Sequence, residues 1–229
     1  MLIYLEGFTP ADLGILGFDK FRVDSNGNEV QLEVIEHAAY CEKRFAIESA
    51  PTGIGKELCA VAIAKVTGLR CAILTATKGL EDQYVRNHER NGIVDIRGRS
   101  NFDCMDNAEL DCRSGSRMGC KYSKGKGCTY EVSRDRARDE DLIVSNYSLW
   151  MSLSNRGGLE RTELDAAFLG ENPVELLILD EAHAAVELLA GHVSFKLYER
   201  DIDKWSEPKK LGEGLDEWKR VAKVAMPEL

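Results

Sequence analysis

The chain has 229 residues, enough to bury a substantial core as one domain or as two small ones. Its net charge of −9 argues against a protein coated in positive charge for nonspecific nucleic-acid binding. No apolar run approaches the roughly 20 residues that cross a bilayer. The N-terminal segment also lacks the pattern of a secretory signal, so we expect a cytoplasmic protein with no membrane partner.

Apolar runs that alternate with helical segments predict an α/β fold, a doubly wound parallel sheet. Each of these runs is short and ends in small or polar residues, as strands do where they lead into loops. In chain order, we expect a helix at 29–43, a strand at 45–49, a helix at 56–67, a strand at 71–77, a helix at 78–90, and strands at 141–147 and 176–182.

The segment APTGIGK, residues 50–56, lies between a predicted strand and a predicted helix, the context of a phosphate-binding loop. Glycine backbone N–H groups wrap phosphates there, and Lys56 neutralises the terminal ones. The alternative is a glycine-containing turn with an exposed lysine. The residues expected to bind nucleotide are Pro51, Thr52, Gly53, Ile54, Gly55, Lys56 and Glu57.

Glu57 is the unusual residue of this loop, because a Ser or Thr hydroxyl normally binds magnesium at that position. A carboxylate oxygen is also a ligand for Mg²⁺, so the metal could bridge Glu57 and the phosphates. Alternatively, Glu57 turns away and water takes the position. We expect retained nucleotide binding with weakened or altered hydrolysis.

Four cysteines follow one another with seven residues between each pair, in a polar segment at 97–130 that has few large apolar residues. Such a segment needs a metal or a cluster to hold it. The missing CxxC pair disfavours an ordinary zinc ribbon. A 4Fe-4S cluster is the first interpretation, structural zinc the second and free thiols the third. The predicted ligands are Cys104, Cys112, Cys120 and Cys128; the other cysteines, Cys41, Cys59 and Cys71, are expected to be small buried side chains.

The stretch 113–138 carries eight Lys or Arg residues against two acidic ones. Such a segment could contact the phosphates of a nucleic acid, although a solvated charged face is the simpler interpretation. Tyr122 and Tyr130 each follow a cysteine by two residues, and they could stack on bases or pack against the cluster.

The motif LLILDEAH, residues 176–183, places two acids directly after an apolar strand. Asp180 is expected to hold magnesium through water, and Glu181 to orient or deprotonate the attacking water. Acidic residues alone often cap the next helix. Together with the loop, however, the motif predicts a site for ATP and Mg²⁺ with Lys56, Asp180 and Glu181 as catalytic residues.

These motifs resemble the N-terminal part of superfamily 2 DNA helicases of the XPD/DinG branch, including related phage helicases. The resemblance is carried by EVQLEVIEHA around Gln31, the loop, TATKGLEDQ at 75–83, GRSNFDC at 98–104, SNYSLW at 145–150 and the DEAH box. It extends from about residue 20 to about 200. An Arg-Pro pair usually stands shortly before the glutamine, whereas here Arg22 lies nine residues upstream.

The resemblance implies an ATP-dependent 5′-to-3′ helicase that acts on single-stranded or forked DNA. Gln31 would read the adenine, and a second RecA-like domain, in cis or in trans, would complete the site. The alternatives are a noncatalytic, helicase-derived DNA-binding or regulatory module with a degraded ATP site, and a zinc-stabilised adaptor. The implied DNA contacts are Thr75, Thr77, Lys78, Gln83, Arg99, Arg113, Arg117, Lys121, Tyr122 and Asn146.

The resemblance also implies a division of the chain into a RecA-like domain with an inserted cluster domain. The expected boundaries are 1–97 for the first part of the RecA-like domain, 98–135 for the iron–sulfur insert, 136–188 for the second part with the DEAH box, and 189–229 for the start of a helical arch domain.

Overall fold

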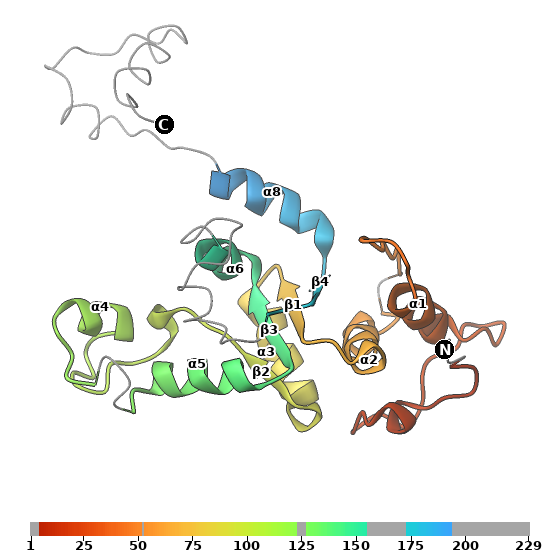
Figure 1. Cartoon of the computed structure of the whole chain (residues 1–229), viewed down its shortest axis with the longest axis horizontal. Helices are drawn as coiled ribbons and strands as arrows, with labels where there is room; N and C mark the ends of the chain where they lie inside the picture. Colours follow the sequence, from red (N-terminus) through yellow and green to blue (C-terminus); the bar gives the residue numbers. More distant parts are fainter. Residues whose placement is uncertain (1–4, 52, 123–126, 155–172, 194–229) are drawn as a thin grey trace, which may run out of the picture. The chain divides into compact units, whose positions relative to one another are not determined.

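The computed structural model describes residues 5–51, 53–122, 127–154 and 173–193. The chain separates into two compact units, Met1–Leu189 and Ala190–Leu229. Thr52 and most of the expected arch segment lie outside the described residues. The first unit contains every described strand and all of the residues of the candidate site (Figure 1).

Four parallel strands form one sheet in the order β2-β3-β1-β4. The strands are β1 (Cys71–Thr75), β2 (Ile93–Asp95), β3 (Leu142–Asn146) and β4 (Leu176–Leu179). All five residues of β1 are buried, as expected for a central strand covered on both faces. The predicted α/β fold with a parallel sheet is therefore confirmed.

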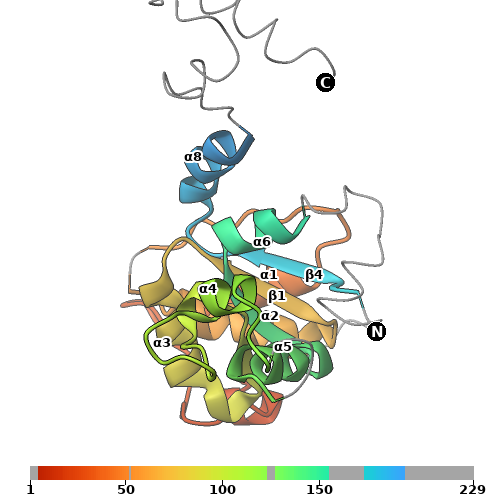
Figure 2. The same cartoon turned by 90° about the vertical axis from the view of Figure 1, so that its left-hand side faces the viewer.

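Helices cover the sheet on both faces, with α2 and α5 on opposite sides (Figures 1 and 2). Alternate residues of β1 explain this arrangement: Cys71 and Ile73 pack with α1 and α2, whereas Ala72 packs with Ala137 of α5. The helices are α1 (Val30–Ala39), α2 (Lys56–Thr67), α3 (Lys78–His88), α4 (Cys112–Arg117), α5 (Thr129–Asp139), α6 (Tyr147–Ser154) and α8 (Ala182–Val193), with short 3-10 turns η1 (Pro10–Leu13), η2 (Glu89–Asn91) and η3 (Arg99–Asn101).

The prediction of a strand at 45–49 is wrong, because residues 45–50 form no strand. Phe45 and Ile47 are 74% and 89% exposed. The segment is instead held at α1, where His37 contacts Glu48 and the Cys41 thiol lies 3.9 Å from the Phe45 carbonyl oxygen. A strand exists only through a neighbour's hydrogen bonds, and within the described chain β4 pairs with β1 alone.

The cysteine-rich segment contains a small buried cluster. Cys112, Cys128 and Tyr130 are buried together, with Phe102 and Tyr122 packed against them. The rings of Phe102 and Tyr130 meet edge to face at 5.6 Å. α5 continues through the predicted boundary at 135/136, so it links this core to the sheet.

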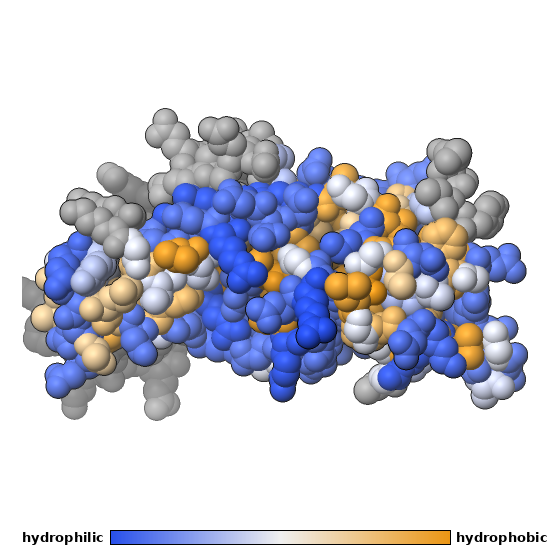
Figure 3. Space-filling model, turned by 90° about the horizontal axis from the view of Figure 1, so that it is seen from below, coloured by the Kyte–Doolittle hydropathy of each residue, from blue (hydrophilic) through white to orange (hydrophobic). Residues whose placement is uncertain are grey.

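No helix in the described part of the chain is long and apolar enough to span a membrane. The face of the molecule seen in Figure 3 is mainly hydrophilic, with apolar side chains in separate small patches. Large exposed apolar residues include Leu16, Val23, Met118 and Val132.

Candidate functional site

The phosphate-binding loop is shaped by two glycines with backbone angles that other residues rarely adopt. Gly53 and Gly55 have φ of 87° and 88°, and α2 begins immediately afterwards at Lys56. A side chain at Gly55 would also meet Gln31 at 2.6 Å. The first backbone N–H groups of α2, which lack partners within the helix, therefore follow a tight glycine turn suited to an anion.

Lys56 and the DEAH acids come together although 125 positions separate Lys56 from Glu181. The Lys56 ammonium donates to Glu181 Oε1 at 3.4 Å. Parallel pairing of β4 with β1 makes this possible, because the backbone N–H of Asp180 donates to the Leu74 carbonyl at the end of the strand. The three predicted catalytic residues therefore lie at one edge of the sheet, where ligands of open parallel sheets bind.

Two tyrosines hold Asp180 in place. Tyr84 of α3 donates to its carboxylate at 3.1 Å, and Tyr147 of α6 donates to its carbonyl oxygen at 2.9 Å. Burial raises the pKa of Asp180 above its usual range, and the Tyr84 hydroxyl opposes this. Glu181 has φ 52°, and such left-handed backbone in a residue other than glycine is found at functional sites.

Glu57 is turned toward α3 in this structure. Its carboxylate accepts from Gln83 at 2.7 Å and from Asn87 at 3.0 Å, and it lies 3.3 Å from the buried ring of His88. Burial alone raises the pKa of Glu57, but the nearby His88 ring and the hydrogen bonds from Gln83 and Asn87 outweigh it and lower the pKa. Glu57 is therefore ionised at neutral pH.

Gln31 holds the loop from beneath. Its amide donates to the Ile54 carbonyl at 2.6 Å, and its oxygen accepts from the Arg22 backbone N–H at 2.6 Å. The Arg22 guanidinium in turn contacts the Gly53 carbonyl. Gln31 is 1% exposed and contacts the loop rather than open solvent, so reading of adenine by Gln31 stays a prediction. Pro51 at the start of the loop is exposed.

Several residues predicted to contact DNA have internal roles at the ends of β1 and β3. Thr75 is fully buried and donates to carbonyls of Thr77 and Ser145, so it has no exposed surface in this structure and its contact with nucleic acid stays a prediction. Thr77 caps α3 through the Leu80 N–H. Asn146 donates to Glu81 at 3.2 Å.

Other predicted DNA contacts remain at the surface. Lys78 is exposed and donates to Asn101 at 2.6 Å, and Gln83 is exposed although its amide binds Glu57. Arg113 and Arg117 project from α4 and are exposed.

Near the cysteines, predicted DNA contacts also form local pairs. The Arg99 guanidinium lies 4.3 Å from the Tyr130 ring, 2.9 Å from Glu131 and 3.8 Å from the Cys112 sulfur. Lys121 pairs with an Asp106 oxygen at 2.8 Å and lies over the Tyr122 ring. The structure thus places Tyr130 against the cysteine core, which is the packing alternative for that residue.

The four predicted metal ligands lie in two pairs at α4. The sulfurs of Cys112 and Cys128 are 3.7 Å apart, and Cys104 is beside Cys120. Gly115 makes room for Cys104, since a methyl group there would stand 2.9 Å from Cys104 Cβ. Within the described residues, no three metal-ligating side chains are close enough to hold one ion. Four cysteine thiols are suitable ligands for a metal or a cluster, but in this structure they are arranged as two separate pairs, Cys112 with Cys128 and Cys104 with Cys120.

The protonation of these thiols differs between the pairs. Backbone N–H groups of Asp106 and Asn107 lower the pKa of Cys104, and Cys120 adds to the effect. Burial raises the pKa of Cys112 to about 11. The lowered value favours the thiolate that binds metals.

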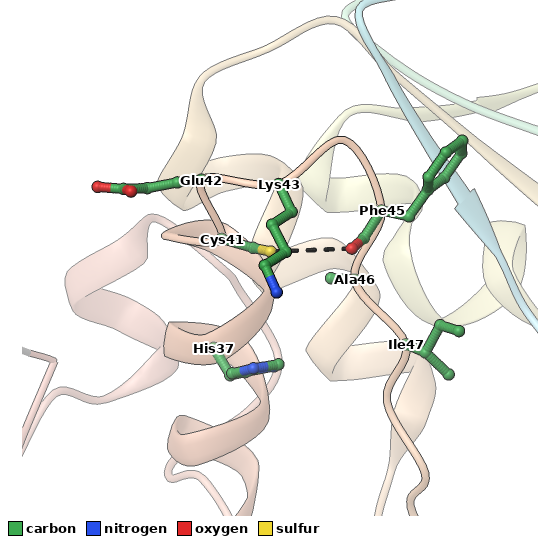
Figure 4. Close-up of a pocket in the computed structure, with 7 residues that line it drawn as sticks. All are labelled: His37, Cys41, Glu42, Lys43, Phe45, Ala46 and Ile47. Atoms are coloured by element: carbon green, nitrogen blue, oxygen red, sulfur yellow. Dashed lines mark hydrogen bonds between the residues drawn. The ribbon is translucent and has the colours of Figure 1, made fainter.

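An open hollow of about 510 Å³ lies beside the end of α1, next to the segment that leads into the phosphate loop (Figure 4). It combines apolar walls with a few polar groups. Its lining consists of His37, Cys41, Glu42, Lys43, Phe45, Ala46 and Ile47. No residue predicted to bind nucleotide contributes to it, so the site at Lys56 and the hollow are separate features.

The polar inner face of α3 escaped the sequence interpretation. Glu81, Tyr84 and His88 are all buried and follow one another at helical spacing, three and four residues apart. Arg97 pairs with Glu81 from the sheet side, its Nε 3.7 Å from the carboxylate. Buried polar residues at the spacing of one helix face are the signal that could have revealed these groups.

No model of a known protein family matches this chain, and no curated protein matches it.

Proposed function

We propose that this chain is the first ATPase domain of a DNA helicase. Its RecA-like sheet would bind ATP and Mg²⁺, and its cysteine-rich insert would hold a 4Fe-4S cluster. One observation carries the proposal. The Lys56 ammonium, at the end of a loop shaped by two glycines, lies 3.4 Å from the carboxylate of Glu181, and Asp180 and Glu181 directly follow the parallel strand β4. A cation and two acids at the carboxyl edge of such a sheet form a site for nucleotide phosphates and their metal.

In this function Lys56 and the N-terminus of α2 would bind the phosphates, and Asp180 would hold, through water, a magnesium ion that supplies positive charge to the phosphates. Tyr84 and Tyr147 fix Asp180 from two helices, so this acid is positioned before nucleotide arrives. In the absence of nucleotide Glu181 contacts Lys56. When Lys56 binds phosphates instead, Glu181 would be free to orient the attacking water. A second RecA-like domain, in cis or in trans, completes the site.

DNA would follow the surface beyond the α3 start and the cysteine-rich segment. Lys78, Arg113, Arg117 and Lys121 are exposed there and carry positive charge on an acidic protein. Local positive charge of this kind attracts phosphates. The four thiols supply the donor set of a 4Fe-4S cluster, with zinc as the alternative. A cluster absorbs visible light and zinc does not, so anaerobic purification with iron and zinc analysis separates the two.

ATP binding and hydrolysis by the full chain, with and without single-stranded DNA and a second RecA-like domain, test this function. Lys56→Ala should abolish nucleotide binding, whereas Lys65→Ala at the exposed end of the same helix should retain it. If Lys56→Ala binds nucleotide as the unmodified chain does, the proposed ATPase function is wrong.

A noncatalytic DNA-binding or regulatory module is the second candidate, favoured by the engagement of Glu57 with α3. In that case the position after Lys56 gives the metal no ligand, and hydrolysis is lost. Turnover by Glu57→Thr distinguishes the candidates. A variant that gains hydrolysis from an inactive parent supports the noncatalytic module, whereas an active parent supports the motor.

A further inference from the structure

The carboxylate of Glu57 is the end of a polar chain that runs beneath α3. Both of its oxygens have partners on that helix, and its side chain is 15% exposed. Three α3 side chains converge on it from successive turns: Gln83, Asn87 and His88. Gln83 and Asn87 donate hydrogen bonds to the carboxylate, and the buried His88 Nε2 lies 3.3 Å from it without hydrogen-bond geometry. The convergence of three side chains of one helix on this ionised group therefore forms a specific contact between α2 and α3.

The proton on the His88 ring can be located from the far end of this chain. The Leu16 backbone N–H donates to the Asn91 side-chain oxygen at 2.6 Å, and the Asn91 amide donates back to the Leu16 carbonyl at 3.3 Å. Asn91 is therefore fixed with its NH₂ group toward His88 Nδ1, 3.1 Å away. A nitrogen that faces an N–H donor accepts, so the ring proton is inferred to lie on Nε2, which faces Glu57.

The surroundings of His88 fix its ring in this orientation. His88 has no exposed surface, and its ring stacks on Phe18 at 5.1 Å with an angle of 17° between the planes. Tyr84, one turn earlier on the same helix, binds Asp180. α3 therefore contacts both halves of the candidate site: Glu57 at the start of α2, and Asp180 after β4.

We propose that Glu57 is a positioning residue that ties the phosphate loop to α3, and that it is not a magnesium ligand. This inference rests on the proposed nucleotide site. The chain from Leu16 through Asn91 and His88 holds the first turn of α2, while Tyr84 holds Asp180, so α3 sets the position of Lys56 relative to the acids. Magnesium would then be held by Asp180, and Glu57 would keep the phosphate loop ordered without giving the metal an oxygen ligand.

¹⁵N NMR of the His88 ring nitrogens tests the contact between Glu57 and α3 in the absence of nucleotide. In the full chain labelled with ¹⁵N, His88 should show its ring proton on Nε2 and Nδ1 as the acceptor from Asn91, and Glu57→Gln should shift the Nε2 signal. Glu33→Gln, an exposed glutamate in the first turn of α1, is the matched control and should leave the signal unchanged. A His88 proton on Nδ1, or a signal unaffected by Glu57→Gln, would overturn the proposal.

Magnesium titration of a bound fluorescent ATP analogue tests the second part. Glu57→Gln should weaken nucleotide binding, because the loop is less ordered, and leave the magnesium concentration for half-maximal binding unchanged. Asp180→Asn should raise that concentration by roughly 10- to 100-fold, the cost of disturbing a metal site. A rise of this size in Glu57→Gln would make Glu57 a ligand and refute the inference. If the unmodified chain binds no nucleotide, the proposed function fails, whereas the His88 ring still decides the tie.

Discussion

The buried carboxyl group of Glu81 is expected to contribute less to the stability of the fold as the pH rises toward neutrality. Glu81 has no exposed surface, and its carboxylate has one hydrogen-bond donor, Asn146, and a guanidinium 3.7 Å away, that of Arg97. Burial raises its pKa from 4.5 to about 7, because the loss of water outweighs the help of Asn146 and Arg97.

The folded and unfolded chains lose the Glu81 proton at different pH values. Below pH 4.5, the ordinary pKa, Glu81 is protonated in both states and its contribution to stability is complete. As the pH rises toward 7, the unfolded chain loses the proton first, so the free energy of unfolding falls. The loss reaches about 3 kcal/mol above that range, since one pKa unit corresponds to about 1.4 kcal/mol.

Urea unfolding of the chain and of Glu81→Gln, from acidic to mildly alkaline pH, measures this loss. Glutamine mimics the protonated acid, so the variant should gain stability relative to the parent by about 3 kcal/mol as the pH rises from 4.5 to about 7. Asp82 and Asp95, which also pair with Arg97, are common to both proteins and cancel in the difference. Stability curves that run parallel would refute the reasoning.

Two further predictions concern α3 and α4. Tyr84→Phe removes the hydroxyl that binds the Asp180 carboxylate and should cost about 1–3 kcal/mol in urea unfolding, whereas an unchanged midpoint would show that the bond adds nothing. Gly115→Ala should cost about 1–3 kcal/mol of local stability because its methyl group overlaps Cys104, and it should speed alkylation of that buried thiol, followed by mass spectrometry. Gly79→Ala, also within a helix but with ordinary contacts, is the control that should stabilise by roughly 0.5–1 kcal/mol; equal effects of the two alanines would contradict the packing argument.

Local patterns determined much of this protein. Apolar runs of strand length located β1, β3 and β4, and the helical segment after the loop has the predicted bounds, Lys56–Thr67. These elements depend mainly on the spacing of apolar residues and on glycine, which can be read along the chain. The same information placed Asp180 and Glu181 after a strand and Lys56 at the start of a helix, and the pairing of β4 with β1 brings these residues to one edge of the sheet.

Tertiary structure alone decided what each polar side chain contacts. The residues 45–49 have the pattern of a strand, yet they lie against α1, because pairing requires a neighbour that the local sequence does not specify. The direction of Glu57, the burial of Thr75 and the raised pKa of Glu81 likewise depend on partners far along the chain. The spacing of buried apolar residues can be read along a single helix or strand. The hydrogen bonds and the loss of water around a polar side chain instead depend on which helices and strands pack against each other.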